Sequence, residues 1–113
     1  MNDIDARTHL KSVVLRWAAE LDVQVQSLSI RPMKRKWASC SSAGNLSFSS
    51  ELLELEDDLK EYVVVHELLH FSVPNHGKLW KSLMRVHLGD FEELDSRLRQ
   101  YAASSQNARA STG

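Results

Sequence analysis

Residues 62–70 place two histidines and a glutamate in an otherwise apolar segment, in the order His66-Glu67-x-x-His70. Residues 59–71 contain no glycine or proline and have helical length, which predicts a buried helix. Side chains four positions apart on a helix lie on one face, about 6 Å apart along the axis. His66 and His70 can therefore bind one metal ion, which would offset the cost of burying them. Glu67 lies one step around the helix, where its carboxylate can reach a water on that ion without being a ligand.

A third histidine, His76, follows six residues after His70. Pro74 is expected to end the helix shortly after His70, so that the chain turns back and brings His76 to the same ion. Three nitrogen ligands with one open position are typical of a catalytic zinc site, since a structural zinc usually has all four positions filled. The spacing of the three histidines therefore indicates a zinc enzyme.

Size and composition restrict the remaining possibilities. A chain of 113 residues, 42% of them hydrophobic, is long enough for one domain with a small core. The net charge of −1 gives no global attraction to nucleic acid or to anionic membranes. No apolar run could span a bilayer, and residues 1–8 are too polar for a signal peptide. The single cysteine, Cys40, fits a reducing cytoplasm, and we interpret it as a buried, inert thiol rather than a metal ligand or an inhibitory thiolate.

The hydrophobic pattern predicts an α+β domain over residues 1–101, followed by a disordered tail over residues 102–113. Asp57 or Asp58 is the expected N-cap of the helix that carries the histidines. The predicted elements are a helix over 4–21, a strand over 23–30, a hairpin of strands over 37–40 and 45–49, a turn or short helix over 51–58, the helix over 59–71, and helices over 77–87 and 91–101.

A basic cluster lies between the first two predicted strands and consists of Arg31, Lys34, Arg35 and Lys36. Its functional interpretation is contact with a nucleic-acid backbone or an acidic substrate. We favour the alternative, a solvated edge strand protected by charge against aggregation, because four charges make only a modest patch.

Three segments and one tryptophan resemble the YgjP-like zinc metallopeptidases, which are similar to the SprT-like and WLM groups and to the minigluzincins. These are residues 36–42, 62–70 and 75–77 together with Trp80, within a resemblance that covers about residues 31–95. It implies a small zincin-like fold with a mixed sheet beside the active-site helix, Zn²⁺ as cofactor, and protein or peptide substrates.

Transferred onto this sequence, the resemblance implies that His66, His70 and His76 bind zinc and that Glu67 is the general base for attack of a zinc-activated water. Gluzincins instead use a glutamate from a downstream helix as third ligand, which leaves Glu92 and Glu93 as alternatives.

The chain departs from the family pattern at two positions. Ala38 occurs where the family usually has glycine, and Leu79 where it often has phenylalanine. The histidine spacing also equals that of the metzincins, but Val73 and Pro74 occupy the region in which metzincins carry a glycine, so we reject that class.

Several points stay open at the level of sequence. A second group that stabilises the oxyanion is usual in such sites. The candidates are Tyr62, His87, Arg97 and Tyr101, and His87 is also a candidate ligand. By analogy with zincin folds, an extended peptide is expected to pair with the strand over 45–49. Two alternative functions are a nucleic-acid-associated protease module and a latent or non-catalytic zinc protein, with the cleft blocked by Cys40 or the C-terminal segment.

Overall fold

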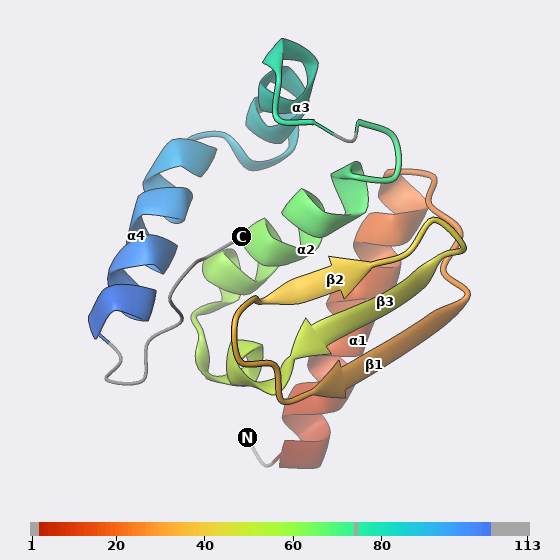
Figure 1. Ribbon diagram of the computed structural model, residues 1–113, viewed down its shortest axis with the longest axis vertical. Coiled ribbons are helices and arrows are strands. Elements are labelled where there is room, and N and C mark those ends of the chain that lie inside the picture. The colour runs from red at the N-terminus through yellow and green to blue at the C-terminus, as the bar shows by residue number, and fades with distance from the viewer. Residues whose placement is uncertain (1–2, 74, 105–113) are drawn as a thin grey trace.

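The computed structural model describes residues 3–73 and 75–104, and it has an α+β fold in which a small sheet lies against helices (Figure 1). The predicted fold class is thereby confirmed. None of the helices in the described ranges has the length and apolar character that crossing a membrane would require. The elements are, in chain order, α1 (Asp3–Glu20), β1 (Ser27–Arg31), β2 (Ala38–Cys40), β3 (Asn45–Ser49), the 3₁₀-helix η1 (Ser50–Glu54), α2 (Asp57–Leu69), α3 (Lys78–Leu88) and α4 (Phe91–Ser104).

The sheet has the strand order β1-β3-β2, with β1 parallel and β2 antiparallel to β3. The predicted hairpin of β2 and β3 is confirmed. Its turn requires a glycine, because Gly44 has φ +96° and a Cβ there would lie 2.8 Å from the carbonyl oxygen of Gln24. Since β3 pairs on both sides, our expectation that Asn45–Ser49 offers an edge to a substrate is wrong. The edge strand beside α2 is β2 (Figure 1).

The first strand begins later than predicted, at Ser27 rather than Val23. Asp22 adopts φ +58°, and the amide of Val23 donates a hydrogen bond to the carbonyl oxygen of Ala18, 2.8 Å away. Asp22 and Val23 therefore still belong to the connection that follows α1. Val23 is partly buried against the core but does not join the sheet. Alternating apolar residues indicate that one side of a segment is buried. An irregular segment can be buried on one side as well, so the pattern did not locate the start of the strand.

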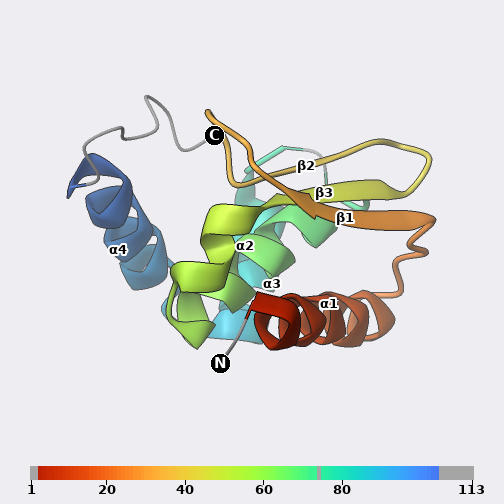
Figure 2. The ribbon, with the colours of Figure 1, turned by 90° about the horizontal axis from the view of Figure 1, so that it is seen from below.

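Helices α1 and α2 lie side by side beneath the sheet, and the core fills the space between these two layers (Figure 2). Phe48 of β3 is completely buried and faces this layer of helices. The largest fully buried side chains come from α1, β3, η1, α2 and α3, and they are Leu10, Val14, Leu46, Phe48, Leu52, Val64, Val65, Leu68 and Met84. One continuous core therefore holds α2, and with it the histidines, in a fixed place under the sheet.

Both ends of α2 differ slightly from prediction. Its N-cap is Glu56, so the expectation of Asp57 or Asp58 is wrong, although both aspartates lie in the first turn, where the helix dipole favours negative charge. The helix ends at Leu69, and His70 is its C-cap with helical φ −64° and ψ −18°. His70 therefore keeps its position one turn after His66. Pro74, the expected helix terminator, lies outside the described residues.

The last helix is longer than predicted. α4 continues to Ser104, and Ala102 is 4% exposed within the core. The predicted tail is therefore wrong for residues 102–104, which belong to a packed helix, and residues 105–113 lie outside the described part of the chain. An alanine in the final turn can be buried by its neighbours even though its own hydrophobic signal is small.

Candidate metal centre

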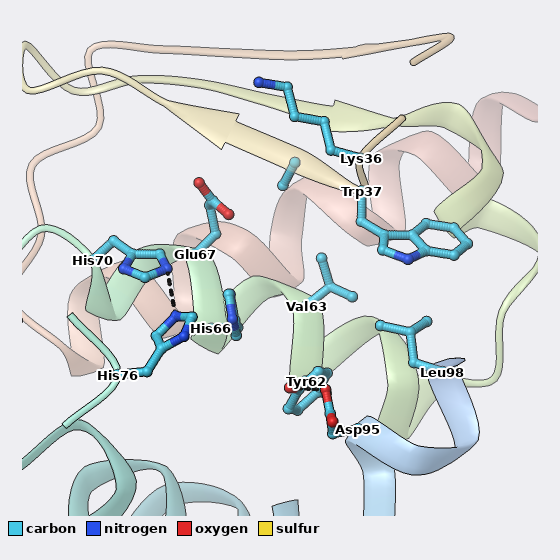
Figure 3. A pocket seen from close by; sticks show the side chains of 11 residues that line it. Lys36, Trp37, Tyr62, Val63, His66, Glu67, His70, His76, Asp95 and Leu98 are labelled. Atoms are coloured by element: carbon cyan, nitrogen blue, oxygen red, sulfur yellow. Dashed lines mark hydrogen bonds between the residues drawn. The ribbon is translucent and has the colours of Figure 1, made fainter. Parts of the chain in front are cut away.

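The three predicted ligands converge in the structure, although they come from different elements (Figure 3). His66 lies on α2, His70 caps that helix, and His76 belongs to the segment that precedes α3. One ring nitrogen from each histidine lies within 4.8 Å of the other two, and the Nε2 atoms of His70 and His76 are 3.2 Å apart. Two nitrogens bound to a tetrahedral zinc at 2.0–2.1 Å would be about 3.4 Å apart. The His70–His76 pair thus has the spacing that such an ion requires, and the His66 nitrogen lies within 4.8 Å of both.

Trp80 supports two of these rings from α3. Its ring lies 4.4 Å from that of His76 and meets that of His66 edge-on at 5.2 Å, measured between centroids. Phe91 of α4 also contacts Trp80, with the ring centroids 5.6 Å apart and an edge-on geometry. Trp80 is 4% exposed, and within the described ranges its indole Nε1 has no hydrogen-bond partner. α3 and α4 therefore restrict the orientation of the imidazoles through one buried aromatic side chain.

The surroundings favour the neutral form of two of the imidazoles, those of His66 and His76. Burial, together with the neighbouring His70 and His76, lowers the pKa of His66 to about 4, against a smaller opposing effect of Asp95. Burial and His70 likewise lower the pKa of His76. A histidine must be neutral to bind a metal, so these shifts favour metal binding at neutral pH. A donor set of three imidazole nitrogens fits the zinc ion that the sequence resemblance implies.

Glu67 lines the same cleft as the histidines, and its carboxylate points towards β2 (Figure 3). There it meets Cys40. Burial of Cys40, then the charge of Glu67 and a hydrogen bond to its carboxylate, raise the pKa of the thiol to about 11. The thiol is therefore neutral and can act as a donor to Glu67. Cys40 is half-buried and does not join the histidine group, in agreement with an inert thiol rather than a ligand.

One residue of the site was missed by our sequence reasoning. Asp95 of α4 lines the cleft, accepts a hydrogen bond from the Tyr62 hydroxyl at 2.7 Å and accepts another from Nε of Arg99 at 2.7 Å. Burial and the Asp95 carboxylate raise the pKa of Tyr62. The sequence offered only the Asp95–Arg99 spacing of four as a signal, and many exposed helical ion pairs share that spacing.

The alternative third ligands lie away from the centre. Glu92 forms an ion pair with Arg85 at 3.2 Å, and Glu93 forms one with Arg97 at 3.6 Å. Neither belongs to the group of side chains that could share an ion in the described part of the chain. His76 is thus the candidate that the fold brings to the other two histidines.

Three of the four candidates for oxyanion stabilisation do not line the cleft. His87 meets Trp17 edge-on at 5.7 Å, next to α1. Arg97 is bound to Glu56 and Asp58, which raise its pKa, and Tyr101 packs against Trp37 at 6.0 Å. Tyr62 does line the cleft, but its hydroxyl donates to Asp95.

The cleft lies between β2 and α2 and holds about 160 Å³. Lys36, one of the four basic residues, lines it, whereas Arg31, Lys34 and Arg35 are exposed around the connection from β1 to β2. The cleft is lined by Lys36, Trp37, Ala38, Tyr62, Val63, His66, Glu67, His70, His76, Asp95 and Leu98.

A helix that carries two histidines beneath an edge strand, with a third histidine from the following segment, defines a small metallopeptidase domain of the zincin type. The model of the YgjP-like metallopeptidase domain matches residues 3–101, and the chain belongs to this family. The resemblance noted in the sequence is thereby confirmed.

Known proteins agree with this assignment. An uncharacterized protein of Methanocaldococcus jannaschii is 29% identical over 80 residues, which cover 66% of this chain and 73% of that protein. The crystal structure of the metallopeptidase zymogen jannalysin, from the same organism, has a TM-score of 0.74 and 26% identity, covering 81% of this chain and 95% of that one. The zymogen abylysin of Pyrococcus abyssi shares the fold, with a TM-score of 0.70, 23% identity and coverage of 83% and 95%. Family and fold together support a metal-dependent peptidase.

Proposed function

We propose that the protein is a zinc peptidase in which His66, His70 and His76 bind the ion and Glu67 is the general base. The observation that carries this proposal is the convergence of three imidazole nitrogens within 4.8 Å, in the same cleft as the Glu67 carboxylate. Three nitrogen ligands leave a fourth position of a tetrahedral ion for water or substrate.

In this proposal each residue of the site has a separate role in the reaction. When bound, a zinc ion polarises the substrate carbonyl and lowers the pKa of a water molecule to about 7. Glu67 accepts the proton of the attacking water and delivers it to the leaving amine. The neighbouring Cys40 thiol, whose pKa is raised by burial and by Glu67, stays neutral and adds no negative charge beside this carboxylate. The neutral state of His66 makes it available as a ligand at neutral pH.

The substrate is an extended peptide that pairs with the free edge of β2. In the described sheet β2 pairs only with β3, so its other side can form backbone hydrogen bonds with an added strand. Because β2 spans only Ala38–Cys40, backbone pairing is short, and side-chain contacts in the cleft must contribute much of the selectivity.

The test separates metal binding from proton transfer. Glu67→Gln should retain one zinc ion per chain and lose peptide cleavage by roughly 10²- to 10⁴-fold, measured by elemental analysis and digestion of a denatured protein. His76→Ala should lose zinc, while Glu92→Ala and Glu93→Ala, matched changes on α4, should retain it. Full activity of Glu67→Gln would refute the mechanism, and zinc loss in either glutamate variant would refute the ligand assignment.

A latent form of the same enzyme is a second candidate, and the likeness to two structures described as zymogens favours it. A deletion that tests latency should begin after Ser104, because Ala102 is buried in α4. Removal of residues 105–113 that raises cleavage while zinc content stays constant would support latency. Unchanged cleavage would argue against it.

Contact with nucleic acid through Arg31, Lys34, Arg35 and Lys36 stays a prediction. All four side chains are exposed. DNA binding that weakens steeply with salt, and that is lost when Lys34, Arg35 and Lys36 are neutralised, would support it. No retention on DNA at low salt would exclude it.

A further inference from the structure

The cleft has two chemically different halves. His70 and His76 lie at one end, whereas Val63, Trp37 and Leu98 lie at the other, with His66 and Glu67 between them (Figure 3). Ala38 also lines it, from the first position of β2. The end away from His70 and His76 is therefore walled mainly by apolar side chains from β2, α2, α4 and the loop before β2. The polar residues at this end lie at its margins, with the hydrogen-bonded pair of Tyr62 and Asp95 on one side and Lys36 on the other (Figure 3).

Most of these apolar walls are rigid parts of the core. Trp37, Val63 and Leu98 are 4%, 5% and 3% exposed, so packing against the core holds them in place on the sides that do not face the cleft. Val63 is one helical turn before Glu67 and faces the same way, about 6 Å along the axis. A substrate side chain placed over Val63 would therefore lie within one residue of the peptide bond that is hydrolysed beside Glu67.

Ala38 differs from these walls because it is half-buried on an edge strand. Side chains alternate along a strand, so Ala38 and Cys40 both face α2, and Ser39 faces away. The methyl group of Ala38 is thus the part of β2 that projects into the apolar half of the cleft. A change in its size alters the space without disturbing a buried core position.

From this geometry we infer that the apolar half of the cleft is a substrate subsite for one aliphatic side chain of leucine size, and that Ala38 sets its upper limit. This inference rests on the proposed function. Burial of such a side chain is favourable because it removes apolar surface from water. A cavity of ~150 Å³ in another protein binds benzene. The whole cleft measures about 160 Å³ and must also admit the reacting peptide group, so the remaining space excludes a large aromatic side chain.

Binding to the zinc-loaded Glu67→Gln protein tests the subsite without relying on turnover. The probes are fluorescent hexapeptides in which each position in turn carries alanine, leucine or phenylalanine, and Kd is measured by anisotropy. At one position, leucine should bind roughly tenfold more tightly than phenylalanine. Adding Ala38→Gly should reduce this preference about tenfold, whereas Ala38→Val should shift it towards alanine.

Two further variants keep the result interpretable. Leu98→Val, on the opposite wall, should act in the same direction as Ala38→Gly, and Ala19→Val on the exposed side of α1 should change nothing. Because each preference is a ratio of two peptides on one protein sample, a partly unfolded variant does not alter it. Preferences unchanged by both Ala38 variants, or no selectivity at any position, would overturn the inference. Selective binding with no cleavage by the wild-type protein would overturn the proposed function alone.

Discussion

At the scale of single residues, the Glu67 carboxylate alters the chemistry of its neighbour Cys40. The thiol faces a carboxylate at a partly buried position, so its deprotonation would place two negative charges side by side. A cysteine this close to the proposed catalytic carboxylate is thereby disfavoured as a nucleophile or as an inhibitory thiolate.

We expect Cys40 of the metal-free protein to react slowly with iodoacetamide at pH 8. With a pKa of about 11 the thiolate fraction is roughly 10²-fold below that of a free cysteine. The greater nucleophilicity of a high-pKa thiolate recovers part of this, which leaves a rate roughly tenfold slower. Glu67→Gln should accelerate alkylation, because a charge and an acceptor that raise the pKa are removed. Mass spectrometry of timed samples gives the rates, and a folded protein that reacts as fast as the urea-unfolded chain would contradict the pairing.

At the scale of elements, one carboxylate joins α4 to the helix that carries the histidines. Asp95 accepts hydrogen bonds from Tyr62 on α2 and from Arg99 on its own helix. This connection lies at the edge of the cleft, opposite β2, and so fixes the distance between two of its walls. The Tyr62 hydroxyl therefore has a structural role as the donor to Asp95, although its position four residues before His66 made it a candidate for catalysis.

Tyr62→Phe should therefore lower stability more than turnover. Removing a hydroxyl that donates to a carboxylate is expected to cost about 1–3 kcal/mol of unfolding free energy. Loss of an oxyanion donor would instead cost 10²- to 10³-fold in kcat. Urea unfolding and peptide cleavage measure the two effects on one preparation. A large fall in kcat at unchanged stability would reassign Tyr62 to the chemistry.

The elements that were predicted correctly are those whose sequence pattern is compatible with only one type of secondary structure. A segment without breakers, apolar on most sides and carrying histidines four apart, can hardly be other than the buried helix α2. By contrast, alternation in β1 does not distinguish a parallel partner from an antiparallel one, so the central place of β3 was not evident. Asp95 was missed because its partners lie on another helix, and a spacing along the chain carries no information about them.

At the scale of the whole molecule, a metal ion bound by the proposed ligands would couple folding to ligand binding. It would connect α2 with the segment before α3, and Trp80 would transmit that connection to α4 through Phe91. An ion bound only by the folded chain stabilises it by about 2.7 kcal/mol at a concentration one hundred times its Kd. Because the three histidines must be neutral to bind it, this gain diminishes in acid.

Acid should also destabilise the metal-free protein, mainly between about pH 6.5 and 4. A histidine in the unfolded chain has a pKa near 6.5, whereas burial beside His70 and His76 lowers the pKa of His66 to about 4. In this interval the unfolded chain binds a proton that the folded chain does not, so stability falls as the pH is lowered. At 1.36 kcal/mol per pKa unit, the loss attributable to His66 reaches ~3 kcal/mol near pH 4. Urea unfolding in EDTA at pH 7, 5.5 and 4 measures this loss, and His66→Gln should remove it. An equal loss in that variant would show that the acid sensitivity originates elsewhere than in the buried imidazole.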